Sequence, residues 1–154
     1  MENVIPLYER NNSNHNQGEK TMGKVRVTYD ETQHCTALQL KNQKTVPIDC
    51  PYTGKGLEFS SGELVGVGVA SCMLMSMGTL AMRDKIDLAD TSVDVEFALK
   101  KDFSRIDSIG LAVNMPRNFS EKERIRLERA AETCPIKHSF HPDVKISVRY
   151  NYPQ

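Results

Sequence analysis

The segment "VGVGVASCMLMSMGTLAM", Val65–Met82, decides how this chain folds. It belongs to a run, 64–82, that contains no charged side chain, with Glu63 directly before it and Arg83 directly after it. Acidic residues favour the first turn of a helix and basic residues favour the last. The segment therefore predicts one long helix over residues 61–85, and a helix that is apolar on all sides has to be buried.

A membrane span is the less favoured interpretation of this segment. Its length is near the minimum for crossing a bilayer. However, it contains three glycines, two serines and a threonine, and no Trp or Tyr flanks it as an interface anchor. We therefore predict that the helix belongs to a protein core, and we predict no membrane partner.

Length and composition favour a cytoplasmic domain without a nucleic-acid partner. The 154 residues fit one domain, 22–154, preceded by a polar, Asn-rich arm, 1–21. The formal net charge is zero, so the basic excess that is typical of nucleic-acid binding is missing. The first residues lack the basic region and apolar run of a secretory signal, which predicts the cytoplasm. The four cysteines are then not expected to form a static disulfide framework.

The remaining patterns predict six strands and a second helix. Short alternating runs over 24–50 indicate a three-stranded meander, and two alternating segments joined by "DFSR" indicate a hairpin. Ser120 and Glu123 form the S-x-x-E capping box of a second helix, and "VKISVRYNY" is a closing strand. The order βββ-α-ββ-α-β predicts an α+β fold of antiparallel sheets with two helices.

The long helix also predicts a dimer. It is too apolar for a 154-residue monomer to cover on every side, because a sheet can bury only one of its faces. A second copy would cover the other face. Gly66 and Ala70, four residues apart, would let two such helices approach closely.

Each predicted helix carries one cysteine, and each cysteine has two interpretations. Cys72 is either a small buried hydrophobic residue or a reactive thiol. Cys134, near the end of the second helix, is either a core residue or a resolving thiol, because a helix C-terminus does not favour a thiolate. Cys35 and Cys50 lie on or beside strands and are interpreted as structural.

A metal or nucleotide cofactor is not predicted. The candidate zinc ligands are Cys134, His138 and His141, with Cys72 as a fourth. There is no C-x-x-C motif, and Pro135 and a turn lie among the candidate ligands. No P-loop or dinucleotide-binding glycine motif occurs either.

The order of these elements and two motifs resemble the OsmC/Ohr family, named for osmotically inducible protein C and organic hydroperoxide resistance protein. The resemblance covers residues 23–150. "ELVGVGVASC" is similar to the start of the family's long helix, and "AAETCP" to its A-E-x-C-P motif. The resemblance implies an intertwined homodimer in which the two long helices are buried back to back.

The resemblance also implies a thiol peroxidase. Cys72 would be the attacking thiol, Cys134 the resolving thiol, and an external dithiol the reductant. Apolar surroundings, rich in methionine, would favour an organic hydroperoxide as substrate. We therefore predict a cysteine-based hydroperoxide reductase; the alternative is a non-catalytic dimeric protein whose pocket holds an apolar ligand.

The activating groups depart from the family pattern. A thiol in apolar surroundings needs a cation to ionise, and the characterised family members supply an Arg from the first hairpin, held by a Glu ten residues before the first cysteine. Here the hairpin turn is "DETQH", and the position ten residues before Cys72 is Gly62, followed by Glu63. Arg26, on the first strand, is the remaining candidate cation of the hairpin, and Lys137 and His138 are others. The predicted site is therefore Cys72, Cys134, Glu63 and Arg26.

Overall fold

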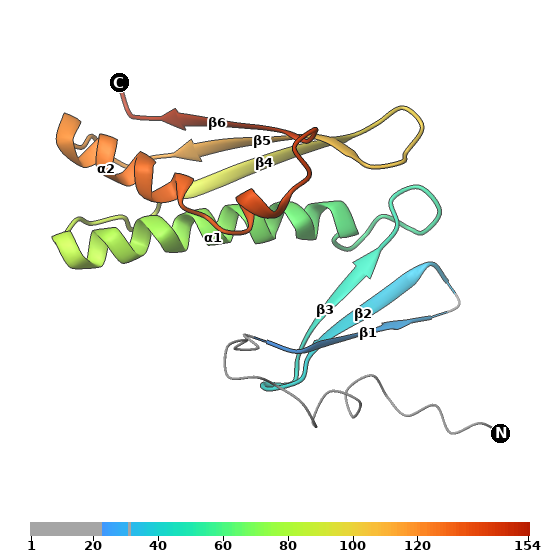
Figure 1. Cartoon of the computed structure of the whole chain (residues 1–154). Helices are drawn as coiled ribbons and strands as arrows, with labels where there is room; N and C mark the ends of the chain where they lie inside the picture. The colour runs from blue at the N-terminus through green and yellow to red at the C-terminus, as the bar shows by residue number, and fades with distance from the viewer. Residues whose placement is uncertain (1–22, 31) are drawn as a thin grey trace, which may run out of the picture. The chain divides into compact units, whose positions relative to one another are not determined.

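We analysed a computed structural model of the chain, which describes residues 23–30 and 32–154 (Figure 1). The predicted N-terminal arm, 1–21, lies outside the described residues. The chain divides into two compact units, Met1–Ile48 and Asp49–Gln154.

The first unit contains the predicted meander. Its strands are β1 (Val25–Tyr29), β2 (His34–Gln39) and β3 (Lys44–Asp49), hydrogen-bonded in the order β1-β2-β3. β1 and β2 are antiparallel, with Arg26 opposite Leu38. The alternation in the sequence therefore predicted this sheet correctly.

The second unit places two helices on one face of a three-stranded sheet (Figure 1). Its elements are α1 (Ser61–Asp84), β4 (Ser92–Leu99), β5 (Ile106–Asn114), α2 (Glu121–Glu132), the 3₁₀ turn η1 (Lys137–Ser139) and β6 (Lys145–Asn151). The sheet order is β4-β5-β6. The predicted α+β class and element order are confirmed.

One strand pairing differs from the expected antiparallel arrangement. β4 and β5 form the predicted antiparallel hairpin, but β6 runs parallel to β5, with Ile109 opposite Ile146 and Val113 opposite Tyr150. Parallel neighbours need a crossover connection, and α2 supplies it. The helix carries the chain back along the sheet, so β6 starts at the same end as β5.

Both long helices begin with a capping box. At α2 the predicted pair is present: Ser120 Oγ accepts the Glu123 N–H, and the Glu123 carboxylate accepts the Ser120 N–H. At α1 the Ser60 N–H donates to Glu63 Oε2 at 2.6 Å, and Ser60 Oγ accepts the Glu63 N–H at 3.2 Å. Each box satisfies helix N–H groups that have no intrahelical acceptor.

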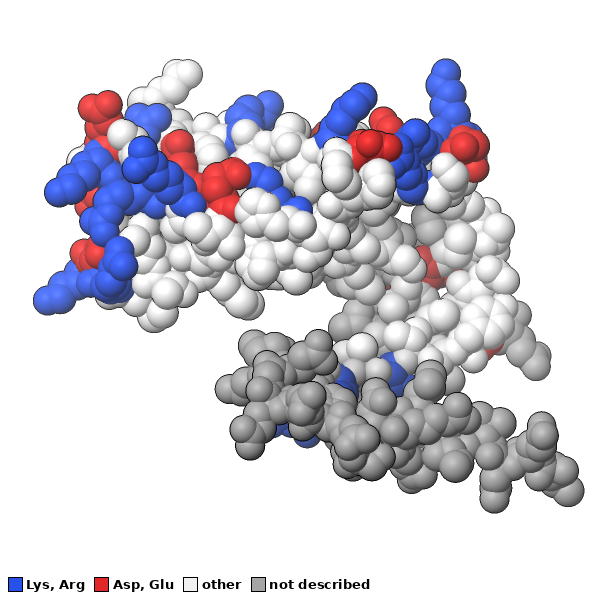
Figure 2. All heavy atoms as spheres, in the orientation of Figure 1, with Lys and Arg blue, Asp and Glu red and all other residues white. Residues whose placement is uncertain are grey.

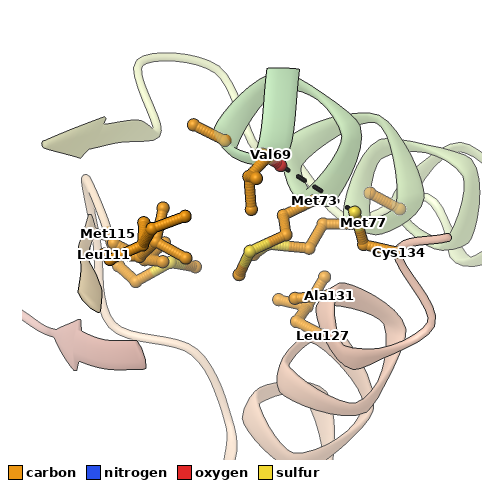
Figure 3. Packing of buried hydrophobic residues seen from close by; sticks show 12 residues of the cluster. Val69, Met73, Met77, Leu111, Met115, Leu127, Ala131 and Cys134 are labelled. Atoms are coloured by element: carbon orange, nitrogen blue, oxygen red, sulfur yellow. Dashed lines mark hydrogen bonds between the residues drawn. The ribbon is translucent and has the colours of Figure 1, made fainter. Parts of the chain in front are cut away.

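The core of the second unit lies between α1, α2 and the inner face of the sheet (Figure 3). Its buried members are Val69, Ala70, Met73, Met77, Ala81, Ile109, Leu111, Val113, Met115, Leu127, Ala131 and Cys134. The period of two in β5 and the i, i+4, i+7 spacing in α2 both predicted their buried faces correctly.

Within one chain, α1 is buried on one face only. Met73 and Met77 are fully buried, whereas Met75 is 71% and Met82 is 78% exposed. Of the described helices, α1 alone is long and apolar enough to cross a membrane by length and composition, a test that the core helix of a soluble protein also passes. Its outer face is apolar and has no cover within its own unit.

Candidate functional site

The structure brings the two predicted redox cysteines together. Cys72 lies in the middle of α1 and is partly buried, and Cys134 lies just after α2 and is fully buried. Cys134 lies close enough to Cys72 for that side chain to raise its pKa. It also points at the turn of α1 that precedes Cys72, with Cys134 Sγ 3.9 Å from the carbonyl oxygen of Val69 (Figure 3).

The end of α2 fixes the position of Cys134. The Cys134 N–H donates to the carbonyl of Ala131 at 3.3 Å, and Pro135 then ends the helix because it has no N–H to donate. The chain turns through η1, where the Lys137 N–H donates to Cys134 Sγ at 3.3 Å. The sulfur is thus held between α1 on one side and backbone N–H groups on the other.

Burial raises the pKa of the Cys134 thiol above its usual value, and the hydrogen bond with Cys72 raises it further. A negative charge on Cys72 acts in the same direction, whereas the N–H groups of Lys137 and Ile136 lower the pKa. These surroundings favour the protonated thiol form of Cys134.

The two cations predicted beside Cys134 are both engaged by Glu132. Lys137 Nζ forms an ion pair with the Glu132 carboxylate. His138 Nε2 lies 2.8 Å from the Glu132 carbonyl oxygen, which makes that ring nitrogen the donor. These contacts engage the side chains of Lys137 and His138 at the end of α2 and not at the thiols; only the backbone N–H of Lys137 reaches Cys134 Sγ.

Glu63 and Gly62 have local structural roles at the start of α1. The Glu63 carboxylate closes the capping box, and its hydrogen bonds to Ser60 lower its pKa. A Cβ atom on Gly62 would lie 2.3 Å from Phe97 Cζ, so the aromatic ring occupies the space of a side chain ten residues before Cys72. This contact explains why the position that carries Glu in the family pattern is glycine here.

Arg26 lies on the exposed strand β1 of the first unit. The two thiols belong to the second unit, so a role of Arg26 beside them stays a prediction.

The zinc alternative has no support among the described residues. No group of three or more His, Cys, Asp or Glu side chains within 23–30 and 32–154 is placed to hold a metal ion. His138 contacts Glu132, as described above, and His141 Nδ1 lies near Asp143 and Arg105 instead.

Sequence reasoning missed an acidic thiol at Cys50. Its sulfur accepts a hydrogen bond from Thr53 Oγ1 at 3.0 Å, and the backbone N–H groups of the following turn, Tyr52 first among them, act on it as well. Led by the Thr53 hydroxyl, these donors lower the pKa of Cys50 to about 7. The signal was the turn sequence "CPYTG", which places a hydroxyl three residues after the cysteine.

We expect iodoacetamide to alkylate Cys50 with a pH dependence centred on about 7, because the thiolate is the nucleophile. In Thr53→Val, which removes the first of these donors, the midpoint should move upward. Peptide mass spectrometry of protein labelled at several pH values would measure it. A midpoint near 9 in the unmodified protein would contradict the geometry of this turn.

A second candidate site is an open groove between α1 and the edge strand β4. Its volume is about 720 Å³. Its apolar lining consists of Phe59, Val67, Val93, Val95 and Phe97, and its carboxylates are Glu63, Asp94 and Glu96. The groove is open to solvent, and its apolar wall could hold an apolar small molecule only beside these carboxylates.

Comparison with known proteins supports the same family as the fold. A protein of Psychrobacter arcticus 273-4, named for osmotic stress induction and a detoxification response, has 28% identity and a TM-score of 0.79 over 86% of this chain and 98% of its own. The organic hydroperoxide resistance protein OhrB of Bacillus subtilis has 16% identity and a TM-score of 0.64 over 85% and 98%. The organic hydroperoxide resistance protein OsmC of Legionella pneumophila has 16% identity and a TM-score of 0.65 over 86% and 99%. No curated protein sequence matches.

The family assignment rests on a direct match as well. The model of the OsmC-like protein family matches residues 54–149, which include α1, α2 and both cysteines of the pair. The chain therefore belongs to the OsmC-like proteins.

Proposed function

We propose that the protein reduces organic hydroperoxides with Cys72 and Cys134. The observation that carries this proposal is the proximity of the two thiols: Cys134 is fully buried and lies against the turn of α1 that precedes Cys72, which is only partly buried. Two of the similar structures are proteins named for organic hydroperoxide resistance, which supports the substrate class. We place the reaction in the cytoplasm.

The reaction has two steps on the protein. The Cys72 thiolate attacks one peroxide oxygen, the O–O bond breaks, and the substrate leaves as an alcohol after taking up a proton. Cys72 is then a sulfenic acid. The sulfur of Cys134 attacks the sulfur of Cys72, the hydroxyl leaves as water, and a disulfide forms. An external dithiol restores both thiols by exchange.

The surroundings of the two cysteines indicate which thiol attacks the peroxide and which one resolves the sulfenic acid. Cys134 is fully buried and its pKa is raised, so it stays a thiol while Cys72 reacts. Its contact with α1 puts it next to the sulfenic acid that it has to resolve. Cys72 is the partly exposed residue of the pair, and we infer that it is the one that a substrate reaches.

We also propose that the working form is a homodimer joined through the outer face of α1. Figure 2 shows an uncharged surface along most of this helix. Met75 and Met82 are exposed there, and a Cβ atom on Gly68 or Gly78 would meet nothing within 4 Å. Glycine inside a helix costs about 1 kcal/mol relative to alanine, and close approach of a second helix is the gain that offsets it.

Cys72 and Cys134 are expected to form a disulfide when the reduced protein receives one equivalent of an alkyl hydroperoxide. Loss of thiols is followed over seconds to minutes, and peptide mass spectrometry maps the bond. An equal amount of hydrogen peroxide is the comparison for substrate class, and the organic peroxide should react faster.

Cys50 provides the matched control for this experiment, because its low pKa makes it reactive without a resolving partner. A Cys50→Ser variant should form the Cys72–Cys134 bond at the unchanged rate. The proposal fails if the two thiols stay reduced for hours or if oxidation maps only to Cys35 or Cys50.

The groove beside β4 favours a second candidate function, the binding of an apolar ligand without catalysis. Glu132 favours this candidate, because it engages the side chains of Lys137 and His138, the two groups near Cys134 that could otherwise stabilise a thiolate. This function would be supported if a fluorescent fatty-acid probe binds the native protein and does not bind the Val67→Asp variant. Hydroperoxide turnover without probe binding would reject it.

A further inference from the structure

We propose that the external thiol attacks the Cys72 sulfur of the Cys72–Cys134 disulfide, so that the Cys134 sulfur leaves toward the Lys137 N–H. This inference rests on the proposed function, because it concerns the step that returns the oxidised protein to its dithiol form. It assigns unequal roles to the two sulfurs of one bond.

Access gives the first argument. Thiol–disulfide exchange needs the incoming sulfur to approach the attacked sulfur along the S–S axis. Cys134 has no exposed surface, because it belongs to the buried cluster between α1 and α2 and its sulfur faces the Val69 carbonyl (Figure 3). Cys72 keeps exposed surface. A second copy on α1 can only reduce these exposures, so it does not open a path to Cys134.

The hydrogen-bond donors around Cys134 also favour its departure as the leaving sulfur. Attack at Cys72 expels Cys134 as a thiolate, which needs hydrogen-bond donors. The Lys137 N–H already lies 3.3 Å from Cys134 Sγ, and the Ile136 N–H acts on the same sulfur. Both donors belong to the backbone of the turn after Pro135, so they are in place before the bond breaks and need no reorganisation.

The surroundings of Cys134 stabilise its thiolate better during this step than they do in the reduced protein. In the reduced pair the pKa of Cys134 is raised by burial, by its hydrogen bond with Cys72 and by charge on Cys72. Once Cys72 carries the reductant in a mixed disulfide, it has neither charge nor a thiolate to accept a proton. Only burial then opposes the Cys134 thiolate, while the two N–H groups continue to stabilise it.

The exchange conserves bonds and electrons. A thiolate of the dithiol reductant bonds to Cys72 Sγ, the Cys72–Cys134 bond breaks, and its electron pair stays on Cys134. The second thiol of the reductant then attacks the reductant sulfur of the mixed disulfide and releases Cys72 as a thiolate. Two electrons pass from the dithiol to the protein, and the dithiol leaves as a disulfide.

The test uses the full chain in a Cys35→Ser, Cys50→Ser background, where only the pair can react. Diamide, rather than a peroxide, forms the disulfide, so the result does not depend on peroxidase activity. The oxidised protein is mixed with excess 2-mercaptoethanol, quenched in acid at short times, and mapped by peptide mass spectrometry. We expect the mercaptoethanol adduct on Cys72, in excess over Cys134 by on the order of tenfold or more.

A second measurement avoids the back-reaction between the two sulfurs. Mercaptoethanol adducts are made on Cys72 in a Cys134→Ser variant and on Cys134 in a Cys72→Ser variant, with urea and refolding if the buried thiol is slow to react. Dithiothreitol should reduce the Cys72 adduct on the order of tenfold faster, and urea should abolish the difference because it removes burial.

The outcomes separate this inference from the proposed function. An adduct mainly on Cys134, or equal reduction rates in the native variants, would overturn the inference even if the protein reduces peroxides. An adduct on Cys72 supports it even if alkyl hydroperoxides leave the thiols untouched. Failure of diamide to join Cys72 and Cys134 would overturn it as well, because the two sulfurs would not be neighbours.

Discussion

A Cys72→Ser variant should lose turnover of organic hydroperoxide by on the order of 10³-fold or more, because a serine hydroxyl is not ionised near neutral pH and does not form a sulfenic acid. The measurement is peroxide consumption with a dithiol in excess. The substitution removes one sulfur from a partly buried position on α1 and keeps the size of the side chain nearly unchanged. Thermal unfolding of both proteins would show whether the fold is retained.

The matched variant is Cys134→Ser, which should separate the two steps of the reaction. It keeps the attacking thiol, so one equivalent of peroxide should still be consumed at the first encounter and leave a sulfenic acid that dimedone traps on Cys72. Cys35→Ser, on the strand of the other unit, should react like the unmodified protein. Equal turnover in Cys72→Ser and in the unmodified protein would reject the proposed mechanism.

Local periodicity was enough to predict most of the second unit. Val93, Val95 and Phe97 alternate with exposed residues on β4 and face the helices, because a strand buried on one face has a period of two. The S-x-x-E box located the start of α2, and the charges beside the apolar run located both ends of α1 within one residue. These features depend on neighbours in the sequence.

The features that sequence reasoning missed depend on residues far apart in the chain or on exact turn geometry. The parallel pairing of β6 with β5 is a property of the crossover through α2, and alternation looks the same in either direction. The need for glycine at position 62 becomes visible only in the fold, where Phe97, 35 residues later, fills the space of a side chain. The low pKa of Cys50 needs the Thr53 hydroxyl to point at the sulfur.

The candidate site was predicted in part, for the same reason. Cys72 and Cys134 came from two motifs, and the structure places Cys134 beside the turn of α1 that leads into Cys72. The predicted supporting groups have other partners: Glu63 caps α1, while Lys137 and His138 bind Glu132. Residue type identifies a thiol or a cation, but only the fold shows which groups form its hydrogen bonds and ion pairs.

Leu127→Ala should cost about 2–5 kcal/mol of unfolding free energy, the range for removing a fully buried leucine side chain. Leu127 is fully buried and belongs to the cluster in which α2 packs on Met73 and Met77 of α1 (Figure 3). Since small domains have about 5–15 kcal/mol in total, the loss should be plain in the urea midpoint. Equilibrium unfolding of the reduced protein would measure it.

Ile125→Ala on the same helix is the matched control, because Ile125 is 42% exposed and should cost less than about 1 kcal/mol. Leu127→Ala should have a second effect that Ile125→Ala lacks. Leu127 and Ala131 hold the end of α2 on α1, and that contact presses Cys134 against the turn of Val69. Formation of the Cys72–Cys134 disulfide should therefore slow in Leu127→Ala under conditions where the protein is still folded. An unchanged rate would mean that the turn after Pro135, rather than the packing of α2, positions the resolving sulfur.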